Sequence, residues 1–434
     1  MAKKISIIGA GISGIGAAKL ALSIGAEIFI SDGKPTDKLE EELKTAQLFG
    51  LVEFEGGGQS DKIYGTADYP SDLIVVSPAV WRTSPIFEEA QKRGIEVIGE
   101  LEFAFRQSKC RWVAITGSTG KSTTTAMVNA IFGETDIPHC LCGNIGFSAA
   151  ELAPKLPENG VAICEVSSFQ LETIKDFCPD VSVILNLYPN HLDRHKDLDE
   201  YYSTKLKISQ NMKKGLLITT SEPCTTAHDS ELLKKWGNLF YNEADKTLIA
   251  KIKENIKLAG NHNIYNAVIG YEIAKFFGID EEKIFAGISK FNGLEHRMEF
   301  AGEAGGVKFY NDSKATTGEA LLAAISGFAD RSVFLIAGGK DKGVPFADYK
   351  DAIYKHCSAV LAIGEASGRI AECWGEIVIE CETLKNAVET AVNRAKSGGA
   401  VVLSPACASF DQFKGFEDRG EKFKAIVAEI VRNL

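Results

Sequence analysis

A chain of 434 residues is longer than one hydrophobic core ordinarily supports, so two or three domains are expected. Hydrophobic residues make up 45% and charged residues 24%, the balance of a globular enzyme, and no apolar run is long enough for a membrane span. The net charge of −10 argues against nonspecific nucleic-acid binding, and ten scattered cysteines without zinc-type pairs are typical of reduced thiols in a cytoplasm. A monomer is the expected oligomeric state.

The first segment of the chain, which extends to about Gly99, alternates strands and helices as parallel sheets do. Apolar runs predict strands at 3–9, 27–31 and 73–77 and a helix at 14–24. The first strand leads into Gly9-Ala10-Gly11-Ile12-Ser13-Gly14, and Asp32 ends the second strand, as in dinucleotide-binding units. Since a glycine turn at a helix N-terminus binds any diphosphate, an NAD(P)- or FAD-dependent oxidoreductase is one open interpretation.

The second segment begins with a buried strand that ends at Thr116 and leads into a glycine-rich turn. The turn, Gly117 to Gly120, is followed by Lys121-Ser122 and a helix. Glycines let backbone N–H groups face phosphate oxygens, the lysine adds charge at the terminal phosphates, and the serine hydroxyl can ligate Mg²⁺. Ile115 stands where the full P-loop template has its first glycine, so the loop is a shortened variant. We predict that it binds a nucleoside triphosphate, with ATP as the first candidate.

Two further strands of this segment end in polar residues. Glu165 follows the strand at 161–164, and a carboxylate at that position suits Mg²⁺. His191 lies in the stretch after the strand at 181–185; taken alone, it is more typical of a hydrogen-bonded structural histidine. Apolar residues at helical spacing after an Asn/His-rich start also predict a helix at 258–275.

A third segment begins near Phe300 and again alternates strands with helices. Its predicted strands lie at 307–310, 332–336, 359–363 and 400–403. We therefore predict an α/β protein of three domains. They are a Rossmann-like domain at 1–99, a P-loop ATPase-like parallel-sheet domain at 100–299 and a second Rossmann-like domain at 300–434.

Ten ordered motifs together give the chain a family resemblance. They are TGSTGKST (116–123), GNIG (143–146), EVSSFQLE (165–172), NLYPNHLDRH (186–195), YYSTK (201–205), GNHNIYN (260–266), EHRME (295–299), NDSKATT (311–317), AGGKDKG (337–343) and SPACASFDQF (404–413). The chain resembles the Mur ligases, which build the peptide stem of bacterial peptidoglycan. The last motif is most similar to that of the members that add D-glutamate to UDP-N-acetylmuramoyl-L-alanine.

The resemblance implies an ATP site with two Mg²⁺ ions. The implied ATP contacts are Gly117, Ser118, Thr119, Gly120, Lys121, Ser122, Thr123, Asn266 at adenine, Arg297 at the phosphates and Asp312 at the ribose. The implied metal ligands are Ser122, Glu165, His191 and Lys205, with Lys205 carbamylated by CO₂. A lysine ammonium cannot ligate a cation, whereas its carbamate offers anionic oxygens. Lys121, His191 and Lys205 are the implied catalytic residues.

The resemblance also implies the contacts of the other two substrates. Ser13, Asp32 and Ser77 are implied for the UDP group, Asn144 and His191 for the muramoyl-alanine end, and Thr316, Lys342, Ser409 and Phe410 for D-glutamate. Gly33-Lys34 follows Asp32 where an arginine is expected in the D-glutamate-adding members, so the resemblance does not define the uracil contacts. The implied reaction forms an acyl phosphate from ATP and then an amide.

Three alternatives stay open beside this interpretation. Sister Mur ligases add other amino acids with the same core chemistry. An oxidoreductase leaves the loop at 116–123 and the motif at 404–413 without a role. A P-loop regulatory switch leaves the first and third segments without one.

Overall fold

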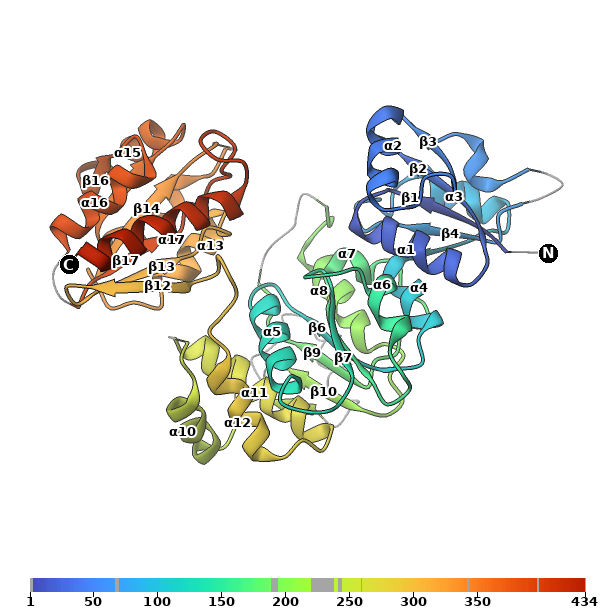
Figure 1. The fold of residues 1–434 in the computed structure, drawn as a ribbon, viewed down its shortest axis with the longest axis horizontal. Helices are drawn as coiled ribbons and strands as arrows, with labels where there is room; N and C mark the ends of the chain where they lie inside the picture. The colour runs from blue at the N-terminus through green and yellow to red at the C-terminus, as the bar shows by residue number, and fades with distance from the viewer. Residues whose placement is uncertain are drawn as a thin grey trace. The chain divides into compact units, whose positions relative to one another are not determined.

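The computed structural model describes residues 3–66, 70–188, 194–219, 238–240, 244–258, 260–341, 343–395 and 398–433. Three sheets organise these residues, and helices cover them (Figure 1). The fold is α/β with mostly parallel strands, as the alternation of strand and helix patterns predicts.

The first sheet has the order β3-β2-β1-β4-β5 and is parallel throughout. Its strands are β1 (Lys4–Ile8), β2 (Glu27–Asp32), β3 (Glu53–Gly56), β4 (Leu73–Val76) and β5 (Glu96–Gly99). The accompanying helices are α1 (Ile12–Ser23), α2 (Thr36–Thr45), the short 3-10 helix η1 (Asp61–Tyr64), α3 (Pro85–Lys92) and α4 (Glu100–Gln107). The strand order reverses at β1, where β2 lies on one side and β4 on the other, and ligands of such sheets bind at that point.

The second sheet has the order β11-β10-β9-β6-β8-β7 and is also parallel. Its strands are β6 (Arg111–Thr116), β7 (His139–Gly143), β8 (Val161–Glu165), β9 (Val181–Ile184), β10 (Leu216–Thr219) and β11 (Asn238–Phe240). Its helices are α5 (Lys121–Phe132), α6 (Ala149–Leu152), η2 (Ala153–Lys155), α7 (Ser168–Leu171), α8 (Leu198–Leu206), η3 (Lys207–Ser209), α10 (Lys246–Asn255), α11 (Asn261–Phe276) and α12 (Glu281–Lys290). β6 lies between β8 and β9, so the turn after β6 is flanked by the ends of both neighbours.

The third sheet has the order β12-β13-β17-β14-β15-β16, and only β12 pairs antiparallel with its neighbour. Its strands are β12 (Glu299–Ala304), β13 (Val307–Asn311), β14 (Val333–Gly338), β15 (Cys357–Ile363), β16 (Val378–Glu380) and β17 (Ala400–Leu403). Its helices are α13 (Gly318–Ile325), η5 (Phe346–Tyr349), α14 (Lys350–His356), α15 (Ser367–Trp374), η6 (Gly375–Ile377), α16 (Leu384–Arg394) and α17 (Phe416–Asn433).

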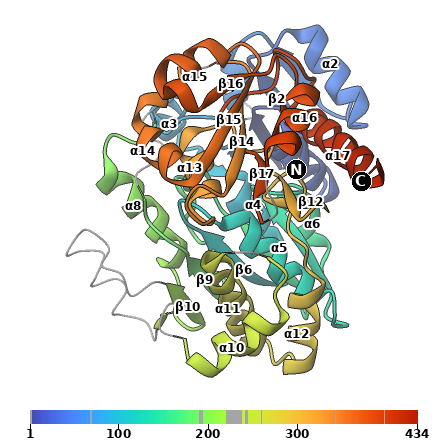
Figure 2. The same cartoon turned by 90° about the vertical axis from the view of Figure 1, so that its left-hand side faces the viewer.

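Alternate residues along the central strands of the third sheet enter two separate cores. Leu335 of β14 packs in the core that includes residues of α13, α14 and α15. Ile336, the next residue, packs with residues of α16 and α17. Figure 2 shows α13 and α14 on one side of β14 and β15, and α16 and α17 on the other. Burial on both faces explains why these strands are continuously apolar in sequence.

The chain divides into two compact units. One comprises residues up to Ile256 together with Ile264–Lys290 and holds the first two sheets; the other comprises Lys257–Asn263 and the residues from Phe291 onward. In the first unit a single apolar core extends from β1 through α1, α4 and α6 to β6. The predicted domain boundaries near residues 99 and 299 stay predictions.

Each strand predicted from an apolar run is present within two residues of its expected bounds, and the two predicted helices are also present. Edge strands such as β3 and β16 lack a strong pattern because only part of their surface is buried. Among the described residues, no helix has the length and apolarity needed to cross a bilayer.

Trp112 of β6 anchors the core that the two sheets of the first unit share. Its ring, fully buried, meets Phe105 and Phe177 edge-on, and its Nε1 donates to Ser108 Oγ at 2.9 Å. We expect Trp112→Ala to lower the free energy of unfolding by about 3–5 kcal/mol, because it leaves a large cavity. Urea titration measures this change. Trp112→Phe, which refills most of the volume, should lose less than half as much, and equal losses for the two variants would contradict this account.

Candidate active site

The turn between β6 and α5 has the backbone geometry that a phosphate loop requires. Gly117 and Gly120 have φ angles of +150° and +80°, which side chains with a Cβ rarely adopt. A Cβ on Gly117 would also lie 2.8 Å from Leu185 Cβ. The φ angle and the close contact with Leu185 therefore both require glycine at position 117. The loop leads directly into the N-terminus of α5, where anions bind favourably.

Two lysines converge on one carbonyl oxygen of this loop. Lys121 Nζ donates to Gly117 O at 2.8 Å and to Ser118 O at 3.0 Å, and Lys205 Nζ donates to Gly117 O at 2.9 Å. Lys205 is buried, with 1% of its surface exposed. Burial, followed by repulsion from the Lys121 ammonium, lowers the pKa of Lys205 to about 6, although Glu165 acts in the opposite direction. The catalytic lysines inferred from the resemblance thus lie together at the loop.

Asn186 also binds the loop, although the sequence interpretation assigned it no role. Its Oδ1 accepts from the backbone N–H groups of Ser118 at 3.1 Å and Thr119 at 2.9 Å. Its Nδ2 donates to Thr119 O at 3.2 Å. Asn186 opens the motif at 186–195, just after β9, the strand next to β6. A polar residue at the end of a strand beside a phosphate loop was the available signal.

The end of β8 supplies an oxygen donor set beside the loop. Glu165 is 1% exposed and pairs in register with Ile115, the residue before Thr116. Its Oε1 accepts from Asn144 Nδ2 at 2.6 Å, whereas Oε2 is buried and has no hydrogen-bond partner among the described residues. Thr116 Oγ1 is likewise buried without a partner in the described part of the chain, and Ser122 is buried at the start of α5. Orphaned hard oxygens of this kind fit Mg²⁺.

Other predicted residues of this unit are placed as follows. Asn266 of α11 accepts a hydrogen bond from Thr124 Oγ1 at 3.0 Å. Asn266 therefore lies beside the first turn of α5, close to the phosphate loop. Thr123 lies in that same turn and is partly exposed. His191 lies outside the described residues. The neighbouring His195 is described; it is buried, contacts Ser168 Oγ at 3.1 Å, and has a pKa lowered by burial.

The three residues predicted for the UDP group lie at the ends of the first-sheet strands and at the start of α1. Asp32 accepts from the backbone N–H of Ala10 at 2.6 Å and of Lys34 at 2.8 Å, so it shapes the glycine turn. A Cβ on Gly9 would lie 2.8 Å from Ser77 Cβ, which places Ser77 against that turn. Ser13 lies in the first turn of α1. All three lie where the strand order reverses, the ligand-binding position of such sheets.

The second unit holds the remaining predicted contacts. Asp312 is buried; its Oδ2 accepts from Ser404 Oγ at 2.9 Å and its Oδ1 from Met298 N at 3.2 Å. Burial raises the pKa of Asp312 to about 7, with Arg297 acting in the opposite direction. Arg297 Nε is buried without a partner in the described residues.

The predicted amino-acid contacts differ in their exposure. Ser409 is buried and Phe410 is 68% exposed. Thr316 is exposed, just before α13. Lys342 lies outside the described residues.

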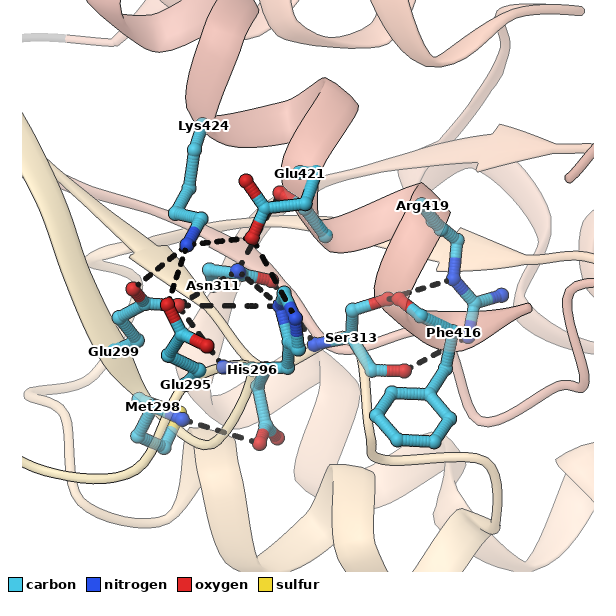
Figure 3. Close-up of polar contacts among 12 residues, drawn as sticks. Glu295, His296, Met298, Glu299, Asn311, Ser313, Phe416, Arg419, Glu421 and Lys424 are labelled. Atoms are coloured by element: carbon cyan, nitrogen blue, oxygen red, sulfur yellow. Dashed lines mark hydrogen bonds and ion pairs between the residues drawn. The ribbon is translucent and has the colours of Figure 1, made fainter. Parts of the chain in front are cut away.

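A polar network, buried at His296 and Asn311 and partly exposed at α17, connects the motif at 295–299 to that helix (Figure 3). Asn311 Nδ2 donates to Glu299 Oε2 at 2.9 Å and lies 3.0 Å from His296 Nδ1. Lys424 of α17 contacts Glu299 at 3.2 Å and Glu421 at 2.7 Å. His296, which has a left-handed φ of +61°, directly precedes Arg297.

Comparisons with known proteins cover nearly the whole chain. Three family models match: the MurD-like N-terminal domain of Mur ligases at 3–99, the Mur ligase middle domain at 115–274, and the Mur ligase glutamate ligase domain at 296–407. The UDP-N-acetylmuramoylalanine--D-glutamate ligase of Aquifex aeolicus is 37% identical over 432 residues, covering 98% of each chain. That of Koribacter versatilis is 35% identical over 453 residues, covering 99% of this chain and 98% of its own.

Solved structures agree on the fold. The UDP-N-acetylmuramate-alanine ligase of Thermotoga maritima aligns with a TM-score of 0.57 at 18% identity, covering 98% of this chain and 99% of its own. The MurF ligase of the same organism, in complex with ADP, aligns with a TM-score of 0.57 at 13% identity, covering 86% and 92%. The full-length relatives, the three matching family models and the phosphate loop with its lysines and carboxylate agree, and the chain therefore belongs to the Mur ligase family.

Proposed function

We propose that the protein joins D-glutamate to UDP-N-acetylmuramoyl-L-alanine with ATP, releasing ADP and phosphate, as a cytoplasmic monomer that makes a bacterial peptidoglycan precursor. The observation that carries the proposal is the phosphate loop with two converging lysines and the orphaned Glu165 oxygen beside it. Relatives that carry this activity in their names match the chain from end to end, which selects this reaction over those of sister ligases.

The first step activates the alanyl carboxylate. One of its oxygens attacks the γ-phosphorus of ATP in line, the bond from that phosphorus to the bridging β–γ oxygen breaks, and ADP leaves. The loop amides and Lys121 are the groups that orient the phosphates and neutralise their charge. Ser122, Glu165, His191 and Lys205 are the proposed ligands of two Mg²⁺ ions, which supply further charge neutralisation when bound.

Lys205 suits carbamylation because its amine is buried and carries a lowered pKa. A neutral amine has the lone pair that CO₂ needs, and at neutral pH most Lys205 side chains are neutral. The N–C bond forms with loss of a proton, leaving a carbamate whose oxygens can bind a hard cation. Lys205 Nζ donates to Gly117 O of the loop at 2.9 Å, and this contact supports the proposal of a carbamate near the phosphates.

The second step forms the amide. The neutral amine of D-glutamate attacks the acyl carbon and its nitrogen loses a proton. The tetrahedral intermediate then collapses, the bond to the phosphate oxygen breaks, and phosphate leaves. Thr316, Lys342, Ser409 and Phe410 are the proposed contacts that position the amino acid. Ser13, Asp32 and Ser77 are proposed to bind the UDP group, and Asn144 and His191 the muramoyl-alanine end.

Phosphate release over a panel of UDP-muramoyl precursors and amino acids of both hands tests this proposal. We expect release only with ATP, UDP-N-acetylmuramoyl-L-alanine and D-glutamate together. Release with L-alanine or a diamino acid instead would assign the chain to a sister activity. Substrate-dependent oxidation of NADH without phosphate release would refute the ligase and support an oxidoreductase.

ATP binding should depend on pH through Asp312. A carboxylate that accepts from ribose hydroxyls binds best when ionised, and Asp312 gains a proton as the pH falls through about 7. We therefore expect the KM for ATP to rise as the pH is lowered from 8 to 6. The titration of ATP itself is common to all variants, so Asp312→Asn, which cannot titrate, is the control. Identical pH profiles for the two enzymes would contradict the assignment.

A further inference from the structure

Arg419 is a fully buried arginine at the start of α17 that joins three separate segments of the third sheet's unit. Its Nε donates to Ser313 Oγ at 3.0 Å, and Nη2 donates to Ser313 O at 2.9 Å and Cys407 O at 3.1 Å. Its Nη1 donates to Ala408 O at 3.4 Å and to Gly338 O at 3.5 Å. Figure 3 shows the guanidinium turned from the helix toward Ser313. The guanidinium thus has acceptors in all three segments.

The acceptors are carbonyl and hydroxyl oxygens rather than carboxylates. Within the described ranges no carboxylate forms an ion pair with the guanidinium, although the Cys407 thiol and the Asp411 carboxyl act to raise the pKa of Arg419. Burial lowers the pKa of Arg419 to about 10, so the group still carries its charge at neutral pH. Burying a cation without a contacting ion partner is costly, and a well-packed apolar residue would hold a core together at lower cost.

The segments that Arg419 joins are those that precede the proposed D-glutamate contacts. Ser313 lies shortly before Thr316, Gly338 lies shortly before Lys342, and Ala408 immediately precedes Ser409. The backbone here is also unusual, because Ala406 has a left-handed φ of +57°. Strain of this kind persists only where surrounding contacts fix the conformation.

The loops that contain Gly339 and Ala408 approach each other so closely that no side chain fits at Gly339. A Cβ on Gly339 would lie 2.3 Å from Ala408 O and 3.1 Å from Arg419 Nη1. Lys340 N donates to Ala408 O at 2.8 Å, so this carbonyl accepts from both a backbone amide and the guanidinium. Removing the guanidinium would therefore release carbonyls from both loops at once.

We propose that Arg419 is a positioning residue for the amino-acid substrate. By holding the three segments in one arrangement, it presents the hydroxyl groups of Thr316 and Ser409 to the two carboxylates of D-glutamate, and its buried positive charge favours that dianion. The proposal rests on the proposed function and adds to it a residue that makes no contact with substrate.

The ATP contact in the same unit should be independent of Arg419. Asp312 is held by Ser404 Oγ and Met298 N, and its own N–H donates to Leu403 O at 2.8 Å. The Arg419 guanidinium donates to none of these groups. Loss of Arg419 should therefore affect the amino acid and spare the nucleotide.

The experiment compares Arg419→Lys with Ser313→Ala and with the control Arg432→Lys. Arg432 is an exposed residue of the same helix that bonds only to Ala428 O within the described part of the chain. Arg419→Lys keeps the positive charge but loses the planar guanidinium that donates to several acceptors at once. We expect it to lower kcat/KM for D-glutamate about 10²-fold, whereas the KM for ATP should stay nearly unchanged. Ser313→Ala removes one hydrogen-bond acceptor of Arg419 and should lower kcat/KM for D-glutamate about fivefold. The control should match the wild type.

A partial reaction separates positioning from general damage. Hydroxylamine traps acyl phosphates as hydroxamates, and trapping requires ATP and UDP-N-acetylmuramoyl-L-alanine but no D-glutamate. Both variants should trap at wild-type rates while amide formation falls. If trapping and D-glutamate kinetics fall together, or if neither changes in folded protein, Arg419 is a structural residue only. A wild type that forms no hydroxamate and releases no phosphate would refute the proposed function itself.

Discussion

Replacing Lys121 by methionine should abolish ATP turnover, with kcat falling by at least about 10²–10³-fold. The Lys121 ammonium donates to the carbonyls of Gly117 and Ser118 at the N-terminus of α5, where we propose that the terminal phosphates of ATP bind. No other residue of the loop carries a positive charge, so the phosphoryl group would develop its charge with less compensation.

The fold should survive this change. Gly117 O keeps its bond from Lys205, and the loop amides keep Asn186, so unfolding in urea should shift little. Lys290→Met is a suitable control, because Lys290 lies on α12 and pairs at the surface with Glu134. A Lys121→Met enzyme that turns over ATP within tenfold of this control would show that the loop has another function.

Replacing Lys205 by methionine should remove activity to a similar degree and yet stabilise the enzyme. Loss of a metal-binding carbamate removes several kcal/mol of stabilisation of the transition state's charge. The rate of the reaction should therefore fall about a thousandfold. The wild type should lose activity when CO₂ is stripped from the buffer and regain it when bicarbonate is added. Lys205→Arg, which keeps a positive charge but forms no stable carbamate, should be inactive in both buffers.

The sign of the stability change follows from the pKa. In CO₂-free buffer Lys205 is neutral in the folded protein above about pH 6, whereas in the unfolded chain it stays protonated up to its ordinary pKa of 10.5. The unfolded state therefore binds more protons in this window, and folding stability rises with pH by at most about 1.4 kcal/mol per unit from this group. Lys205→Met should flatten that slope in urea titrations between pH 6 and pH 9. A wild type indifferent to CO₂ at limiting bicarbonate would reject the carbamate.

The sequence was informative wherever a function needs a particular side chain at a particular backbone position. Glycines at Gly117 and Gly120, followed by Lys121 and Ser122, predict the loop because few other residues can adopt that backbone or contact those phosphates. Glu165 was predictable for a related reason, since it ends an apolar run and parallel strands end at one edge of a sheet.

Residues that act through backbone groups were not predictable in this way. The partners of Asn186 are amides 67 and 68 residues away, and those of Arg419 include a serine 106 residues away. Backbone acceptors exist at every position, so no pattern in the chain distinguishes those that a buried side chain will use. His191 and Lys342, both inferred from the family resemblance, lie outside the described residues and stay predictions.

The bonds from Asn186 to the loop have a consequence for turnover. The amides of Ser118 and Thr119 already have an acceptor, so a nucleotide that uses them exchanges one hydrogen bond for another instead of gaining a new one. After the reaction, ADP offers less charge than ATP, while the competing amide oxygen is unchanged and covalently tethered at high local concentration. The side chain would thus act as an internal competitor that weakens the binding of ATP and ADP by the same factor. Because ADP binds through fewer charges, the weakened ADP complex would dissociate readily at the end of each cycle.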